Sequence, residues 1–283
     1  MSGKIIISIV SLILVVGVAI GVVVAVHKKA NEATGFIARD MTFQNTAGPI
    51  GEQAVAFHNQ GDRSAIVNCH FEGYQDTLYV HANRQFYRDC VISGTIDFIF
   101  GTSHTLIQNS EIILRKPGVN QTVNTITADG TGVSKDMFTG IVIQNCTIVP
   151  DKELIPVITK VKSYLGRPWK ELSRTVFMES NLGDVIDPKG WTPWPDNGTE
   201  INIDRCYYAE YANTGLSANT SQRVKWKGYQ GIISWDVAQN FIGNKWLKPR
   251  NGTKDQKYAK EWLTPDVPHY LGFANKPENK LNM

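Results

Sequence analysis

The chain has 283 residues, enough for one large domain or two small ones, and its 29 basic and 26 acidic residues nearly balance. It has no basic block, which argues against nucleic-acid binding, while the small basic excess is compatible with a secreted protein or one that handles an acidic polymer. Beyond the N-terminus few segments keep a helical period, so a strand-rich fold is expected.

The first 30 residues are dominated by an apolar run. From Ile5 to Val26 the sequence IIISIVSLILVVGVAIGVVVAV carries no charge over 22 residues. This is long enough to span a bilayer and longer than the usual apolar core of a cleaved signal peptide. We therefore expect residues 1–30 to form a signal anchor with one transmembrane helix; a cleaved signal peptide is the alternative.

The flanks of this run and the rest of the chain point to different sides of the membrane. Lys28 and Lys29 follow the run and only Lys4 precedes it, which by the positive-inside rule keeps the remainder in the cytoplasm. Sequons for N-glycosylation favour export instead. They begin at Asn120, Asn145, Asn197, Asn219 and Asn251. We expect export, with the protein either free or tethered by its N-terminal segment.

A six-residue pattern recurs along the chain, with Asp, Asn or Glu third and an apolar residue sixth. Its third positions are separated by 28, 21, 20, 36 and 34 residues, as in a solenoid whose coils carry insertions. The apolar alternation favours strands, so the pattern predicts an all-β parallel β-helix; a β-sandwich with coincidental spacing is the alternative. The copies are ARDMTF at 38–43, IVNCHF at 66–71, YRDCVI at 87–92, IQNSEI at 107–112, IQNCTI at 143–148 and FMESNL at 177–182.

Two aspartates fit this period. Asp76 and Asp97 are 21 residues apart, and Asp97 lies in the apolar run IDFIF, where a carboxylate is costly. If one coil takes 21 residues, the two carboxyl groups stack at about the 4.8 Å strand spacing. Both cannot ionise cheaply, so one acid and one carboxylate would stand side by side, as hydrolysis requires. The alternative is structural: Asp76 caps a turn and Asp97 pairs with a buried arginine.

Further motifs resemble the plant pectin methylesterases over about residues 35–250. That family folds as a right-handed parallel β-helix and removes methyl esters from the galacturonate units of pectin, releasing methanol. The resemblance implies a β-helix catalytic domain over 31–250 and a carbohydrate esterase of the cell wall. The motifs are QAVAF at 53–57, GYQDTLY at 73–79, GTIDFIFG at 94–101, YLGRPW at 164–169, GFIARDMTFQNTAGP at 35–49 and YYAEYANTG at 207–215.

The same resemblance implies roles for particular residues. Asp97 resembles the catalytic nucleophile, and Asp76 the general acid that then activates water as a base. Gln75 resembles a catalytic amide donor to the oxyanion, and Gln53 a second donor that contacts the substrate. The structural alternative for Gln53 and Gln75 is a polar ladder, in which their side chains only bond to each other between coils.

Two more residues are expected to serve binding. Arg167 would hold and orient Asp97 through charge-assisted hydrogen bonds, and Trp169 would offer a flat face to a sugar ring. A plain salt bridge and a core position are the alternatives. No metal or cofactor is implied, and the scattered histidines at 58, 70, 81, 104 and 269 are interpreted as surface or loop residues.

The chain departs from the family pattern near its start. Only Ala30 to Ile37 separate the apolar run from the first recognisable coil. The family has further coils there, with a G-x-Y-x-E motif and a substrate-contacting threonine, and many plant members carry an inhibitor-like pro-domain. The catalytic domain is therefore expected to be truncated at its N-terminal side, which leaves open a non-catalytic, pectin-binding remnant.

The cysteines at 69, 90, 146 and 206 depart as well. The resemblance implies a disulfide between position 90 and position 110, where this chain has Ser110. Positions 69, 90 and 110 form one column of the repeat, so Cys69 becomes the candidate partner of Cys90.

The remaining expectations concern the C-terminus and binding partners. Residues 251–283 are interpreted as a polar tail with a short closing segment and no assigned function. The expected partners are methyl-esterified homogalacturonan and a proteinaceous pectinesterase inhibitor, with no nucleic acid, and the protein is expected to be a monomer. A pectin-acting β-helix of another class, a polygalacturonase or lyase, is the rival enzyme, because glycosidases also use paired carboxylates.

Overall fold

The computed structural model describes residues 34–132, 139–249, 259–264 and 266–274. The expected membrane-spanning segment at residues 5–26 lies outside these residues. Within them, no helix is both long and apolar enough to cross a bilayer.

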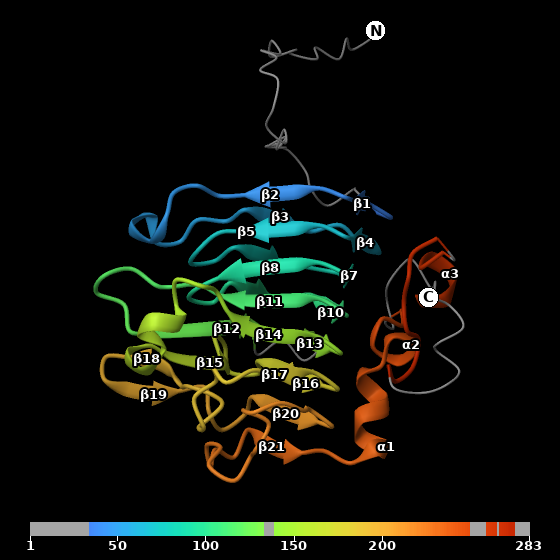
Figure 1. Cartoon of the computed structure of the whole chain (residues 1–283). Helices are drawn as coiled ribbons and strands as arrows, with labels where there is room; N and C mark the ends of the chain where they lie inside the picture. Colours follow the sequence, from blue (N-terminus) through green and yellow to red (C-terminus); the bar gives the residue numbers. More distant parts are fainter. Residues whose placement is uncertain (1–33, 133–138, 250–258, 265, 275–283) are drawn as a thin grey trace, which may run out of the picture.

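The described chain winds into a parallel β-helix with three sheets, and its coils stack from β1 and β2 at one end to β21 at the other (Figure 1). The eight-stranded sheet contains, in spatial order, β1 (Ile37–Arg39), β4 (Ser64–Val67), β7 (Arg84–Arg88), β10 (His104–Gln108), β13 (Gly140–Gln144), β16 (Arg174–Met178), β20 (Tyr207–Tyr211) and β21 (Tyr229–Ile232). The six-stranded sheet contains β17 (Asn181–Leu182), β14 (Thr147–Pro150), β11 (Glu111–Leu114), β8 (Val91–Gly94), β5 (His70–Glu72) and β2 (Thr42–Gln44).

The five-stranded sheet carries the candidate site. It contains β15 (Lys162–Gly166), β12 (Val123–Asp129), β9 (Ile99–Gly101), β6 (Leu78–Val80) and β3 (Phe57–Asn59). An antiparallel hairpin of β18 (Trp194–Asp196) and β19 (Thr199–Ile201) is separate from the three sheets. The short helices are α1 (Trp235–Ala238), α2 (Gly243–Trp246) and α3 (Ala259–Trp262), with 3₁₀ turns η2 (Pro49–Gly51), η3 (Ile155–Lys160) and η4 (Gln239–Phe241).

The six-residue pattern marks a corner of the coil and not a single strand. Each copy ends a strand of the eight-stranded sheet, turns at its third residue and enters the six-stranded sheet. The third residues have positive φ between 50° and 55°, a conformation that Asn and Asp adopt more readily than other non-glycine residues. They are Asp40, Asn68, Asp89, Asn109, Asn145 and Glu179. The six-residue pattern therefore marks the corners of the coils, whereas its apolar alternation predicts strands throughout.

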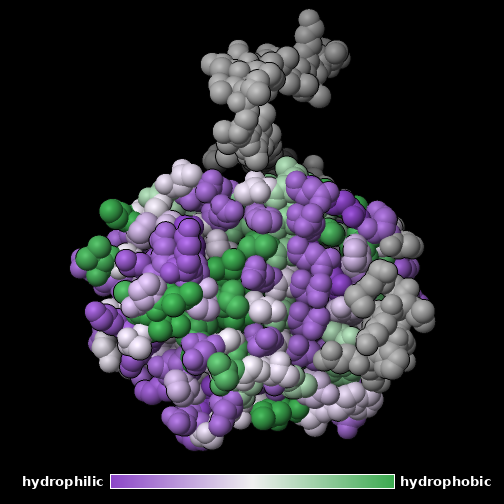
Figure 2. All heavy atoms as spheres, viewed as in Figure 1, coloured by the Kyte–Doolittle hydropathy of each residue, from purple (hydrophilic) through white to green (hydrophobic). Residues whose placement is uncertain are grey.

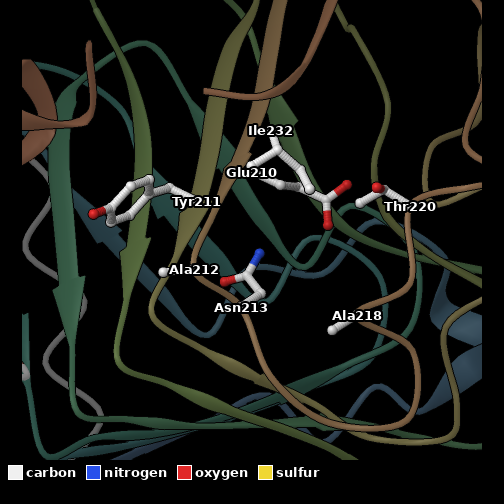
Figure 3. Close-up of a pocket in the computed structure, with 7 residues that line it drawn as sticks. All are labelled: Glu210, Tyr211, Ala212, Asn213, Ala218, Thr220 and Ile232. Atoms are coloured by element: carbon white, nitrogen blue, oxygen red, sulfur yellow. The ribbon is translucent and has the colours of Figure 1, made fainter. Parts of the chain in front are cut away.

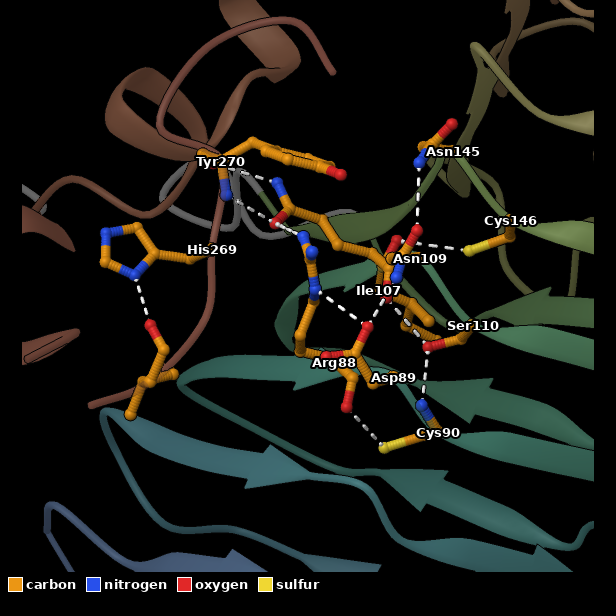
Figure 4. Close-up of polar contacts among 12 residues, drawn as sticks. Arg88, Asp89, Cys90, Ile107, Asn109, Ser110, Asn145, Cys146, His269 and Tyr270 are labelled. Atoms are coloured by element: carbon orange, nitrogen blue, oxygen red, sulfur yellow. Dashed lines mark hydrogen bonds and ion pairs between the residues drawn. The ribbon is translucent and has the colours of Figure 1, made fainter. Parts of the chain in front are cut away.

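The corner side chains bond to one another along the helix axis. The Nδ2 of Asn145 donates to Oδ1 of Asn109 at 3.1 Å, and the Nδ2 of Asn109 donates to Oδ1 of Asp89 at 2.5 Å (Figure 4). Each bond links two adjacent coils, so the polar corner residues stabilise the stacking as well as the turn.

Inside the coils, apolar side chains stack in register. Phe71, Ile92, Ile112, Ile148 and Leu182 face one another on successive strands of the six-stranded sheet, and all are fully buried. Each such burial stabilises the fold by about 1.5–3 kcal/mol relative to exposure. Repeating one apolar position per coil thus builds the core of the solenoid.

The cysteine column also forms, but without a disulfide. The register that pairs His70 with Val91 places Cys69 beside Cys90 in adjacent coils, and Ser110 Oγ accepts a hydrogen bond from the Cys90 backbone N–H at 3.1 Å. All four cysteines are free and buried, so the Cys69–Cys90 bridge is not present. Parallel stacking directs the two thiols to backbone carbonyls instead, that of Cys69 to Val67 at 3.3 Å and that of Cys90 to Arg88 at 3.2 Å.

The C-terminal segment covers the outer face of the eight-stranded sheet and forms a second core there (Figure 1). Phe86, Leu106 and Val142 on the sheet share this core with Phe241 and Trp246. The closing segment, interpreted from its composition as mainly polar, contributes buried apolar residues to the same core. They are Trp262, Leu263, Val267 and Phe273.

Amide side chains of the eight-stranded sheet hold the closing segment in place, and Tyr270 of that segment is labelled in Figure 4. Gln108 donates to the Tyr270 carbonyl and accepts from the Tyr270 backbone N–H, both at 2.9 Å. One coil further on, Gln144 donates to the Gly272 carbonyl at 3.0 Å.

The placement of one histidine corrects an expectation. His104 is neither a surface nor a loop residue: it lies in β10, is 4% exposed and packs edge-on against Trp246.

The side of the molecule in Figure 2 is mostly hydrophilic, with a column of hydrophilic residues along the stack of coils.

Candidate active site

The two predicted aspartates stand at matching positions of adjacent coils. The register that pairs Leu78 with Ile99 aligns Asp76 with Asp97, and the Asp76 backbone N–H donates to the Ile96 carbonyl at 3.0 Å. Both aspartates have positive φ, 61° and 52°, so each occupies a sharp turn directly before a strand of the five-stranded sheet. The 21-residue coil and the pairing predicted from it are confirmed.

Asp97 is 5% exposed and its carboxylate is held on both oxygens. Arg167 donates from Nε to Oδ1 at 2.8 Å and from Nη2 to Oδ2 at 2.7 Å, a bidentate pair. The Thr125 hydroxyl donates to Oδ1 at 2.6 Å and accepts from the Asp97 backbone N–H at 2.9 Å. The carboxylate therefore has a fixed orientation. Thr125 has no signal in the sequence, because nothing in the motif NTITAD distinguishes it from its neighbours.

Asp76 has the opposite environment. No described residue donates a hydrogen bond to its carboxyl group. Burial, and to a lesser extent the nearby charge of Asp97, outweigh the opposing charge of Arg167 and raise the pKa of Asp76 from the usual 3.8 to about 7. The two carboxyl groups thus differ in environment, one paired with a guanidinium and the other retaining its proton to near neutral pH.

All six predicted site residues line one cavity of about 250 Å³. Its walls also include three residues that the sequence analysis did not select, Phe100, Ala128 and Trp194. Gln53 and Gln75 are paired by a parallel bridge between adjacent coils, so their amide groups come from neighbouring turns of the solenoid. The structure brings together every residue expected at the site.

Aromatic rings form one wall of this cavity. The guanidinium of Arg167 lies 4.3 Å from the ring centroid of Trp194, and the rings of Trp169 and Trp194 are 6.5 Å apart. Gly130 supports Trp169 from behind, because a Cβ at that position would come within 2.6 Å of the indole ring. Trp194 belongs to the β18–β19 hairpin, an insertion outside the repeat, which explains why the repeat gave no signal for it.

A second cavity of about 140 Å³ lies near the last coils (Figure 3). Its most polar residue, Glu210, is 2% exposed and already accepts hydrogen bonds from Arg223 at 2.8 and 3.1 Å and from Tyr229 at 3.0 Å. The acidic residue of this cavity is therefore already held in a buried structural ion pair. Among the described residues, no group of three His, Cys, Asp or Glu side chains is placed to hold a metal ion.

Comparison with known proteins agrees with this geometry. The model of the pectinesterase family matches residues 23–250. The chain belongs to the pectinesterase family. It is 54% identical over 220 residues to pectinesterase 5 of Arabidopsis thaliana, which covers 78% of this chain but 36% of the relative. It is 46% identical over 240 residues to pectinesterase/pectinesterase inhibitor 18 of the same plant, covering 83% of this chain and 41% of the relative. The chain thus spans about a third to two fifths of the length of these relatives.

Solved pectinesterases share the architecture. Pectin methylesterase from carrot superimposes with a TM-score of 0.72 and 45% identity, covering 78% of this chain and 70% of the carrot chain. A pectin methylesterase solved in complex with hexasaccharide VII gives a TM-score of 0.63 and 27% identity, covering 79% of this chain and 72% of the other. The parallel β-helix predicted from the repeat is thus the fold of this family.

Proposed function

We propose that this pectinesterase hydrolyses the methyl esters of homogalacturonan in pectin and releases methanol, acting on the plant cell wall after export. The observation that carries the proposal is the pairing of two unlike carboxyl groups in one cavity. Asp97 is held by Arg167 at 2.7 and 2.8 Å, while the pKa of Asp76 is raised to about 7. Solved relatives named pectin methylesterases support the choice of ester.

In the first half-reaction, an Asp97 oxygen attacks the carbonyl carbon of the methyl ester and the carbonyl oxygen becomes an oxyanion. The side-chain amides of Gln53 and Gln75 donate hydrogen bonds to it, and such donors typically contribute about 3 kcal/mol each to transition-state stabilisation. Asp76 gives its proton to the methoxy oxygen as the carbon–oxygen bond breaks. Methanol leaves, and an acyl group remains on Asp97.

In the second half-reaction, Asp76 is ionised and acts as a base. It takes a proton from water, and the water oxygen attacks the same carbonyl carbon. The bond to Asp97 breaks, Asp97 becomes a carboxylate again and Asp76 carries a proton. The product is a galacturonic acid unit, which loses its proton to solvent. Arg167 keeps Asp97 oriented through both steps.

Trp169 and Trp194 would bind the sugar chain beside the reacting ester, since flat apolar ring faces match indole surfaces. A proteinaceous inhibitor is the second proposed partner, because one relative is named pectinesterase/pectinesterase inhibitor 18. We also propose that residues 5–26 tether the protein to the membrane and that the protein is a monomer.

The test is to incubate the purified full chain with highly methylated homogalacturonan and to measure methanol and polymer length together. Methanol release at constant polymer length supports the esterase. Shortening of the polymer without methanol would instead support a polygalacturonase or lyase. Binding of pectin with neither change, by protein whose circular dichroism shows a folded β-structure, would identify a non-catalytic remnant.

A further inference from the structure

A second polar cluster lies on the same sheet, outside the cavity. His58 in β3 and His81 just after β6 face each other, with His58 Nε2 at 2.8 Å from His81 Nδ1. Gln60 contacts both rings, its amide nitrogen lying 3.1 Å from His58 Nε2. The ring planes differ by 22° with centroids 5.0 Å apart. The proposed ester hydrolysis does not use this imidazole–imidazole hydrogen bond.

The pair is joined to the cavity by a row of stacked rings. His58 pairs in register with Tyr79, and Tyr79 with Phe100, on adjacent strands of the five-stranded sheet. Tyr79 stacks on His58 and on Phe100 with centroid distances of 4.5 Å, and on His81 with 4.6 Å. Phe100 lines the cavity. A polymer bound over the row would reach from the reacting carboxyl groups to the histidines.

The hydrogen bond fixes what the pair can present to a ligand. When both rings are neutral, the ring that donates the shared proton has an unprotonated outer nitrogen, and the ring that accepts it has an outer N–H. One added proton converts the pair into a cation with two outer N–H donors and retains the inner bond. If His58 Nε2 and His81 Nδ1 both carried a proton, neither nitrogen could accept and the bond between them would break. The outer nitrogens, His58 Nδ1 and His81 Nε2, have no hydrogen-bond partner among the described residues.

We propose that the His58–His81 pair takes up one proton and binds the carboxylate of a demethylated sugar unit in the same polymer. The inference rests on the proposed function, because the carboxylate is the product of ester hydrolysis. The pair would thereby direct the enzyme, at mildly acidic pH, to esters that neighbour an already demethylated stretch.

The surroundings leave the pair free for such a ligand. Within the described chain, neither histidine has an acidic partner. The neighbouring strands contribute Tyr79 and Phe100, and the charged residues near the turn after β3 bond among themselves, Asp62 to Arg84 at 2.6 Å and to Arg63 at 3.9 Å. Burial lowers the pKa of both histidines, and the proximity of His81 lowers that of His58 further. A bound carboxylate would oppose this effect, so binding and proton uptake are coupled.

The experiment measures binding of the fully demethylated galacturonic acid hexamer to the full chain by calorimetry. Because this ligand carries no ester, the result does not depend on turnover. Affinity should rise by about tenfold from about pH 8 to about pH 5, across the usual histidine pKa of about 6.5, with uptake of a proton. His58→Gln and His81→Gln should each remove most of this increase. The fully methylated hexamer, titrated into Asp97→Asn so that it is not hydrolysed, should show no increase in affinity that depends on His58 or His81.

The matched control is His70→Gln, which replaces an exposed histidine of β5 on the six-stranded sheet and should keep the wild-type pH dependence. Asp76 titrates in the same range in every variant, so the difference between wild type and variant reports on the pair alone. Unchanged pH dependence in both His58→Gln and His81→Gln would overturn the inference. Failure of the proposed function would appear separately, as absence of methanol release from methylated substrate.

Discussion

At the residue scale, one carboxyl group differs from the other only through its neighbours. Asp97 accepts hydrogen bonds from Arg167 and Thr125, whereas Asp76 is largely buried and lies beside the negative charge of Asp97. The sequence supplied two identical aspartates at the right interval, and the fold assigns them unlike environments. Two predictions test these assignments.

The first concerns the bidentate contact of Arg167. Arg167→Lys keeps a positive charge but cannot present two parallel donors to Asp97, so the rate of methanol release should fall by about a hundredfold with little change in melting temperature. Initial rates and thermal melts check this. Arg205→Lys, at the exposed ion pair with Glu171, is the control and should leave the rate unchanged. Near-normal activity of Arg167→Lys would make Arg167 a structural residue only.

The second concerns Asp76 and the pH dependence of stability. Its folded pKa of about 7 lies above the usual 3.8, so between these values the native state binds more protons and stability falls as pH rises. Asp76→Asn removes this loss and should raise the free energy of unfolding at about pH 8 by about 2 kcal/mol, after allowance for solvent screening, with no gain at about pH 3.

Urea titrations at the two pH values measure the Asp76 effect. Asp184→Asn, at an exposed turn, should show no such difference. An equal gain for Asp76→Asn at both pH values would mean that the effect is packing, and that the Asp76 carboxyl group ionises as an ordinary aspartate.

At the element scale, the corner between two sheets is the unit that the sequence predicts best. A polar residue that tolerates positive φ, with an apolar residue three positions later, recurs in every copy, and the spacing of the copies predicts the alignment of Asp76 with Asp97. Where insertions interrupt the spacing, prediction failed. Trp194 lies on such an insertion, and Thr125 follows a long loop, so neither has a fixed place in the repeat.

The corner makes a prediction of its own. Asn109 has φ of 50° and bonds to both neighbouring coils. Asn109→Val loses these bonds and places a β-branched residue in a strained conformation, so unfolding should become easier by about 2 kcal/mol in urea titrations. Asn109→Gly relieves the backbone strain but does not restore the two hydrogen bonds, so its free energy of unfolding should lie between those of wild type and Asn109→Val. Equal stability of Asn109→Val and wild type would refute a structural role for the corner ladder.

At the scale of the whole molecule, the closing segment and the solenoid form a joint core. Composition alone predicts a polar tail for the closing segment, because its apolar residues are spaced irregularly. They become buried only by packing against the eight-stranded sheet. The candidate site lies on another sheet, so the two regions can be tested separately.

Phe273→Ala tests this joint core. The side chain is 5% exposed and packs near Tyr211, with ring centroids 5.4 Å apart. Its removal should lower the free energy of unfolding by about 3 kcal/mol, while methanol release well below the melting temperature stays near wild type. Leu216→Ala, 80% exposed, is the control and should melt as wild type does. An unchanged melting temperature for Phe273→Ala would show that the closing segment does not stabilise the solenoid.

The central claim is that Asp97 is the nucleophile of a pectin methylesterase. The most direct measurement is the initial rate of methanol release from methyl-esterified homogalacturonan by the full chain and by Asp97→Asn at equal concentration, with both shown to be folded. We expect continuous turnover by the wild type and a rate at least about a thousandfold lower for Asp97→Asn. Turnover that persists in Asp97→Asn, or a folded wild type that releases no methanol, would contradict the account.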